Sequence, residues 1–271
     1  MIVTAENYYS REANREYMSA SQFKAFLDCE ARAMAELAGE WQPEPTQAML
    51  VGGYVDAYFS NESGLFRAEH PEIFKRDSTL KAEYLHAEDI IARIERDPLA
   101  MMMLDGKRQT ILINEIHGVP FRGKLDVLLS AAQCAKIAEA FPDMGDLLFA
   151  DGAIVDLKIM RDFEPIYRPE QGRMSFIEYW RYDLQMAVYR HLLGRYVPCY
   201  ILAATKEKVP DIGLFLVPDH MLDTAYYYYM DSLTRIMSVK SGETEPERCE
   251  ACDYCKQTKT LTCGALVGDW A

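Results

Sequence analysis

The chain has 271 residues, of which 49% are hydrophobic, and its formal net charge is −13. This composition predicts a sizeable core, built as one large domain or as one domain with a small appendage. The charge argues against a protein that coats nucleic acid, although a local basic track and bound cations could still hold DNA. The sequence contains no candidate membrane span and no secretory signal, which predicts a cytoplasmic protein.

The first hundred residues are expected to be mainly helical. In the first helical segment, Ser19 or Ser21 is a candidate N-cap and Gly39 a candidate end. The expected elements in chain order are a helix over 18–39, a proline-bearing connection over 41–46, a helix over 48–59, a loop to about residue 78, and a helix over 81–96 with Leu85, Ile90, Ile91 and Ile94 on its apolar face.

The remainder alternates between strand and helix patterns. Two alternating segments on either side of a short turn over 117–120 indicate a β-hairpin. The expected elements are strands over 109–116 and 121–129, a helix and a turn at Pro142 within 132–150, a strand over 153–160, a helix over 176–193, strands over 199–205 and 213–217, and a long helix over 221–239. This order predicts a mixed β-sheet flanked by helices.

The strand AIVDLKIM carries two charges on one face. Because side chains alternate along a strand, Asp156 and Lys158 project together, whereas Val155, Leu157 and Ile159 point to the other side. Charges within an apolar strand are costly unless they are paired, hydrated in a cleft or bound to a cation. This pattern makes the strand a candidate for a polar site.

A second strand repeats the pattern with Asp126 in VPFRGKLDVLL. Its other face is expected to carry Leu125, Val127 and Leu129. Two strand carboxylates and a lysine are suited to holding a hard divalent cation. A salt-bridged surface strand is the simpler reading of an isolated Asp-x-Lys.

The helix over 176–193 contains a polar line beside an apolar stripe. Gln185 and Tyr189 lie four residues apart on one face, with Arg181 one turn earlier. This line suits contacts to a DNA backbone, and an ordinary solvent-exposed edge is the alternative. The neighbouring stripe that we expect to pack on the sheet consists of Leu184, Val188 and His191.

Cysteines are concentrated near the C-terminal end. Two consecutive C-x-x-C steps contain Cys249, Cys252 and Cys255, and Cys263 follows eight residues later. In a chain without an export signal, such spacing favours zinc or an iron–sulfur cluster over disulfides. These four residues could form a local zinc knuckle or remain free thiols. The isolated Cys134 and Cys199 are expected to be structural.

Taken in order, these motifs resemble the PD-(D/E)XK nuclease superfamily. The matching residues are Asp126 on the second strand, Asp156 with Lys158 on the third, and Gln185 with Tyr189 on the following helix. The Gln-x-x-x-Tyr signature is similar to the one that marks the RecB-like branch of this superfamily. The segments MSASQFKAFLDC and VGGYVDAYF are similar to those of phage RecE-type exonucleases (exodeoxyribonuclease VIII).

The resemblance implies an α/β (α+β) fold with a restriction-endonuclease-like core, a central mixed sheet flanked by helices. It implies one nuclease domain over 1–271, with a helical segment over about 19–100 and a cysteine-rich tail over about 245–271. The 132–150 insertion is longer than a hairpin requires. We interpret it as an element for contacting DNA or forming oligomers.

The resemblance also implies a Mg²⁺ or Mn²⁺ site. Asp126, Asp156 and the Leu157 carbonyl would hold the cation, and Lys158 would orient or deprotonate water or stabilise the phosphate. The family usually has a metal-binding histidine where this chain has Asp56. We interpret Asp56 as a substituted metal ligand, with a solvated helix charge as the alternative.

Cluster-bearing RecB-like nucleases join one N-terminal cysteine to three C-terminal cysteines around a [4Fe–4S] cluster. Cys29 occupies the position of the first ligand, so Cys29, Cys249, Cys252 and Cys255 form a second candidate ligand set. The C-x-x-C-x-x-C spacing differs from the C-x-x-C-x5-C of those relatives.

The function implied by the resemblance is 5′–3′ digestion of linear double-stranded DNA in phage or prophage recombination. The expected partners are DNA, a single-strand annealing protein and further copies of the chain in a ring, with no membrane association. Two alternatives remain. One is a CRISPR-adaptation-like iron–sulfur nuclease for single-stranded ends, and the other is a non-catalytic cysteine–metal module that binds DNA.

Overall fold

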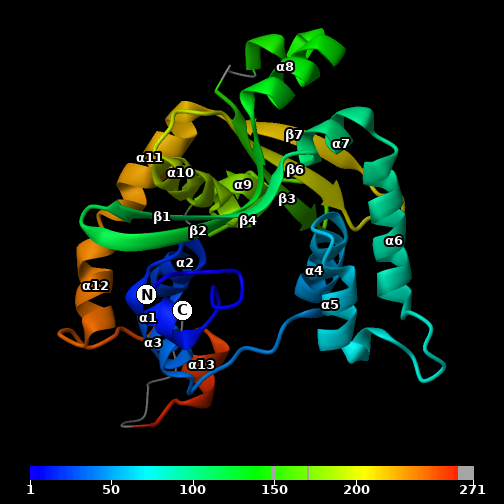
Figure 1. The fold of residues 1–271 in the computed structure, drawn as a ribbon. Coiled ribbons are helices and arrows are strands. Elements are labelled where there is room, and N and C mark those ends of the chain that lie inside the picture. Colours follow the sequence, from blue (N-terminus) through cyan, green and yellow to red (C-terminus); the bar gives the residue numbers. More distant parts are fainter. Residues whose placement is uncertain (148–150, 170, 262–271) are drawn as a thin grey trace.

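A computed structural model describes residues 1–147, 151–169 and 171–261 (Figure 1). Within these ranges the chain forms helices, short 3₁₀ turns (η), a five-stranded sheet and a separate two-stranded hairpin. The elements are α1 (Arg11–Glu16), α2 (Ala20–Asp28), α3 (Glu30–Ala38), α4 (Gln47–Phe59), α5 (Ser63–Glu69), η1 (Pro71–Ile73), α6 (Ala82–Glu95), α7 (Pro98–Leu104), β1 (Lys107–Ile116), β2 (Val119–Leu129), α8 (Ala131–Ala140), η2 (Pro142–Leu147), β3 (Ala153–Met160), β4 (Ile166–Arg168), β5 (Gly172–Met174), α9 (Phe176–Tyr179), α10 (Tyr182–Leu193), β6 (Cys199–Thr205), β7 (Ile212–Val217), α11 (Asp219–Met230), α12 (Leu233–Ser241) and α13 (Asp253–Gln257).

The central sheet has the strand order β1-β2-β3-β6-β7. β3 and β6 are parallel, and the other neighbouring pairs are antiparallel, so the sheet is mixed. The crossover from β3 to β6 runs through α9 and α10, as a parallel pair requires. The expected mixed sheet flanked by helices is therefore confirmed.

Apolar side chains form a core on each face of the sheet. One core joins the sheet to α2, α10, α11 and α12, with Phe23, Leu184 and Ile201 among its buried members. The other joins the opposite face to α4, α6, α7 and α8, with Val55 and Ile90 fully buried. Figure 1 shows α11 and α12 on one side of the molecule and α4, α6 and α7 on the other. Burial on both faces explains the nearly continuous apolar sequences of β3 and β6.

The β1–β2 hairpin turns at only two residues, His117 and Gly118. Both have positive φ angles, 51° and 76°, as a tight primed hairpin turn demands. Val119 and Pro120, expected in the turn, belong to β2. Farther along β2, Leu125 packs in a different core from Val127 and Leu129, so the expectation of one shared face is wrong there. Gln109, opposite this point on β1, has a φ of 47°, which interrupts the regular pleat.

Three expected helices are broken in the structure. The 18–39 segment divides at Cys29, the 176–193 segment at Arg181, and the 221–239 segment between α11 and α12. Cys29 is extended, and Arg181 has a left-handed φ of 52° and contacts Asp28 at 2.6 Å. Neither position has a glycine or proline, so the helical periodicity gave no sign of these breaks.

Several smaller expectations are also corrected. The expected loop before residue 78 contains α5 and η1, and the β4–β5 hairpin was not anticipated. Leu85 is 52% exposed because it lies off the buried stripe of α6. His191 is also exposed, and its ring stacks on the Tyr226 ring with 3.8 Å between the ring centres. Among the described residues, no helix is long and apolar enough to cross a membrane.

Candidate active site

The two strand carboxylates are brought together by the pairing of β2 with β3. Val127 is opposite Val155 in this ladder, which places Asp126 beside the middle of β3. The Leu157 backbone N–H donates a hydrogen bond to Asp126 Oδ2 at 3.0 Å. Asp156 lies on the adjacent strand and is only 1% exposed. The structure thus joins two residues that are 30 positions apart in the chain.

Lys158 makes an ion pair with Asp156, as the strand alternation predicts. Its ammonium group also lies 5.1 Å from the centre of the Tyr182 ring. Burial opposes the positive charge, but the carboxylates of Asp156 and Asp126 outweigh it and raise the pKa of Lys158. A lysine held in this way is a fixed cation, which suits stabilising negative charge better than accepting a proton.

The electrostatics of Asp126 fit a cation site. Burial raises its pKa well above the ordinary aspartate value, and the charge of Asp156 raises it further. The pKa of Asp56 is also raised, mainly by burial and further by the charge of Asp156. Several carboxylates that disfavour one another's charge are stabilised by a shared divalent cation. The donor set therefore fits Mg²⁺ or Mn²⁺.

A cavity of about 880 Å³ opens next to these groups. Asp56 of α4 lines it together with Asp126 and Lys158, so the helix carboxylate faces the same space as the strand residues. Leu157, the expected carbonyl ligand, also lines it. Three aromatic residues line part of this cavity: Tyr179, Trp180 and Tyr182.

Gln185 and Tyr189 of α10 reach the same centre. Gln185 Nε2 donates to Asp156 Oδ1 at 2.9 Å and lies 3.3 Å from the Tyr189 hydroxyl. α10 approaches the sheet closely at Gly123, where an added Cβ would lie 3.0 Å from the Tyr189 ring. The absence of a side chain on Gly123 therefore lets Tyr189 pack beside β2. Arg181, expected on the same line, instead pairs with Asp28.

The sequence reasoning missed Lys24 and Tyr182. Lys24 of α2 donates to Gln185 Oε1 at 3.1 Å, which directs the Gln185 amide N–H toward Asp156. Tyr182 precedes Gln185 by three residues, so helical spacing could have identified it. Lys24 is 161 positions away from Gln185, and only the fold brings them together.

We expect Lys24→Met to reduce turnover by about ten- to a hundredfold with a smaller change in KM, since a charged hydrogen bond is worth about 1.5–3 kcal/mol. Burial lowers the pKa of Lys24 to about 8, with Lys158 contributing. Lys24 loses its charge as the pH rises through this value, and the wild-type pH–rate profile should show an inflection there. The inflection should be absent from Lys24→Met. If it persists, or if Lys24→Arg fails to restore activity, Lys24 does not position Gln185.

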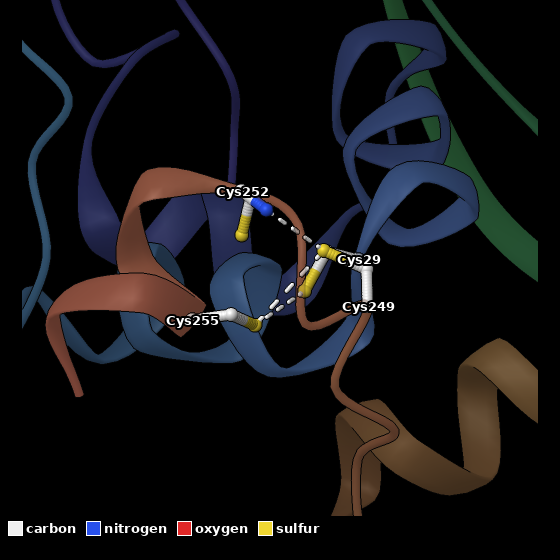
Figure 2. Close-up of side chains that lie close together, drawn as sticks. All are labelled: Cys29, Cys249, Cys252 and Cys255. Carbon is white, nitrogen blue, oxygen red and sulfur yellow. Dashed lines mark hydrogen bonds between the residues drawn. The ribbon is translucent and has the colours of Figure 1, made fainter. Parts of the chain in front are cut away.

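A second polar site lies at the junction between α2 and α3. The sulfur atoms of Cys29, Cys249, Cys252 and Cys255 all lie within 4.8 Å of one another. Figure 2 shows their side chains pointing toward a common centre, with Cys29 from the helical segment and the others from the tail. This grouping matches the candidate set that includes Cys29. Cys263 of the alternative knuckle lies outside the described residues.

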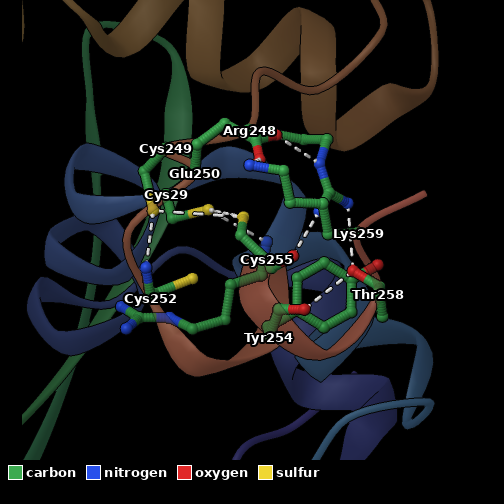
Figure 3. Close-up of polar contacts among 10 residues, drawn as sticks. Cys29, Arg248, Cys249, Glu250, Cys252, Tyr254, Cys255, Thr258 and Lys259 are labelled. Atoms are coloured by element: carbon green, nitrogen blue, oxygen red, sulfur yellow. Dashed lines mark hydrogen bonds and ion pairs between the residues drawn. The ribbon is translucent and has the colours of Figure 1, made fainter. Parts of the chain in front are cut away.

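Local contacts hold this cysteine site in place. The Cys29 sulfur accepts the Arg32 backbone N–H at 3.4 Å and so caps α3. The Arg248 guanidinium donates to the Cys255 carbonyl at 2.7 Å, as Figure 3 shows. Although burial opposes it, the backbone N–H groups of Ala251 and Cys252 lower the pKa of Cys249 to about 6. Cys249 is thus the thiol of this group most easily converted to the thiolate that binds metals, whereas burial raises the pKa of Cys29 and of Cys252.

Comparison with known proteins agrees with this architecture. A family model described as a PDDEXK-like domain of unknown function matches residues 19–135 and 142–258. The chain belongs to this PDDEXK-like family. The match includes both strand carboxylates, Lys158 and α10, and it confirms the predicted superfamily and fold class.

A solved structure supports the same assignment. The crystal structure of a putative exonuclease from Eubacterium rectale is 38% identical to this PDDEXK-like chain, with a TM-score of 0.87. The alignment covers 98% of this chain and 97% of the other, so the likeness extends over both proteins. No curated protein matches the sequence.

Proposed function

We propose that this PDDEXK-like protein is a divalent-metal-dependent nuclease that hydrolyses phosphodiester bonds of DNA. The observation that carries the proposal is the joining of Asp126, Asp156 and Lys158 on adjacent strands next to a cavity of about 880 Å³. Two carboxylates and a fixed ammonium group are the side chains that metal-assisted phosphate hydrolysis needs. The solved relative described as a putative exonuclease supports this assignment.

The proposed roles of the residues follow from their contacts. Asp126, Asp156 and the Leu157 carbonyl would hold Mg²⁺ or Mn²⁺, with Asp56 as a further ligand from α4. Such a cation supplies an activated water and stabilises charge on the phosphate. Lys158 would stabilise the same developing charge. Gln185 would hold Asp156 in orientation, and Tyr189 would fix Gln185 through its hydroxyl.

The finer proposal is an exonuclease of the RecE-like phage type. We infer that it digests linear duplex DNA in the 5′–3′ direction and leaves a 3′ single strand for an annealing protein. It would act as a homo-oligomer. The resemblance of the motifs to that group supports the proposal, as does the solved relative described as a putative exonuclease. The aromatic cavity wall also supports an end-directed enzyme, because exposed rings such as Trp180 can stack on unpaired bases.

Digestion of end-labelled linear DNA tests the proposal. With Mg²⁺, 5′-labelled duplex should release short labelled products first, whereas a covalently closed circle should remain intact. A chelator or Asp156→Ala should abolish release. Loss of label only from single-stranded ends would instead favour the adaptation-type nuclease. DNA binding without any cleavage would favour a non-catalytic module.

A further inference from the structure

The distances between the four cysteine sulfurs suit a single bound metal ion. The Cys29 and Cys255 sulfurs are 3.6 Å apart, the Cys249 and Cys255 sulfurs are 4.0 Å apart, and every pair among the four lies within 4.8 Å. Four sulfurs at about 2.3 Å from one tetrahedral Zn²⁺ lie about 3.8 Å from one another. The observed spacings are close to this value.

An iron–sulfur cube fits these spacings less well. In a [4Fe–4S] cluster each cysteine binds a different iron atom, and the inorganic core stands between the sulfurs. The four thiolates must therefore lie farther apart than they do around one ion. The contacts between Cys255 and both Cys29 and Cys249 leave no space for such a core without moving the tail.

The tail containing three of the cysteines has little else to anchor it by burial. Between residues 243 and 261, Cys255 is the one described residue that is fully buried, and Leu261 is 82% exposed. The apolar cluster here consists of Cys29, Ala31 and Cys255, with Cys252 and Tyr254 packed against it. A segment that cannot build its own core commonly depends on a metal or a disulfide.

Polar contacts place the tail beside α3 but do not enclose it. The Ala31 N–H donates to the Glu247 carbonyl at 3.0 Å, and the Glu247 N–H donates to Glu30 Oε2 at 2.8 Å. Arg235 of α12 binds both carboxylate oxygens of Glu30 at 2.8 and 2.9 Å. These contacts place Cys29 opposite the start of the tail.

We propose that Cys29, Cys249, Cys252 and Cys255 bind one structural Zn²⁺ ion, which fastens the tail to the break between α2 and α3. All four positions of a tetrahedral ion are then filled by protein, as in closed structural zinc sites. The site is separate from the carboxylate centre, so it stabilises the fold and takes no part in hydrolysis. This inference does not depend on the proposed nuclease activity.

Metal analysis of the full chain tests the proposal. Protein expressed with ample iron and zinc and purified without oxygen should contain about one zinc ion per chain and should be colourless. Added Co²⁺ should give the visible bands of a tetrahedral thiolate complex. Removing zinc with a strong chelator should expose the tail after residue 243 to limited proteolysis while the rest of the chain resists.

Two substitutions provide a matched comparison. Cys255→Ala should lose the zinc and show the same tail cleavage, whereas Cys134→Ala, at an equally buried cysteine in α8, should retain it. About four iron atoms per chain with a brown colour would overturn the proposal, as would metal-free protein with all four thiols open to alkylation. If Cys255→Ala is insoluble, the metal content of the unaltered chain decides. Nuclease assays on the same samples report separately on the carboxylate site.

Discussion

Lys158→Met should reduce DNA cleavage by about 10²–10³-fold, the usual effect of losing one group that stabilises charge in a transition state. Methionine preserves much of the side-chain volume and removes the ammonium group that contacts Asp156. The initial rate on end-labelled duplex at saturating Mg²⁺ measures the effect. Binding of Mg²⁺, measured by calorimetry, should be retained or tightened because a nearby positive charge is gone.

Lys206→Met is the matched control for Lys158. Lys206 lines the same cavity but, among the described residues, makes no ion pair with Asp56, Asp126 or Asp156. Its removal should change the rate by less than about fivefold, in keeping with the small effects of most surface charges. Equal losses in the two variants would show that general attraction to DNA, and not the position of Lys158, supports cleavage.

Asp126→Asn should have opposite effects on activity and on stability. The amide keeps an oxygen for the Leu157 N–H but cannot supply the charge that holds a divalent cation, so cleavage should fall by about 10³-fold or more. Without a cation, the same variant should be more stable than the wild type, since it removes a carboxylate that burial and Asp156 disfavour. Thermal unfolding in the presence of a chelator measures this gain.

The pH dependence of that gain follows from the raised pKa of Asp126. Because its pKa is higher in the folded than in the unfolded chain, the folded state binds a proton more tightly. Chelated wild-type protein should therefore lose stability as the pH rises above about 4, the unperturbed aspartate value. Asp126→Asn should lack this loss. Asp162→Asn, at another carboxylate lining the cavity, serves as the control, and an equal gain there would contradict the assignment to Asp126.

The local pattern of the carboxylate strands was readable from the sequence because strand alternation is a short-range property. The shared face of Asp156 and Lys158 follows from a period of two, and the common face of Gln185 and Tyr189 follows from helical spacing. The helix breaks at Cys29 and Arg181 were not readable. Their backbone conformations depend on tertiary contacts, such as that between Arg181 and Asp28.

The sequence by itself determined the order along the chain of the five strands of the central sheet, the polar residues within the apolar strands and the clustered cysteines of the tail. Only the tertiary structure decided that Lys24 contacts Gln185, that Asp56 shares a cavity with Asp126, and that Cys29 completes the cysteine group. The physical reason is distance along the chain. Periodicity fixes which way a side chain points within its own element, whereas strand pairing and packing on the two cores fix which elements meet.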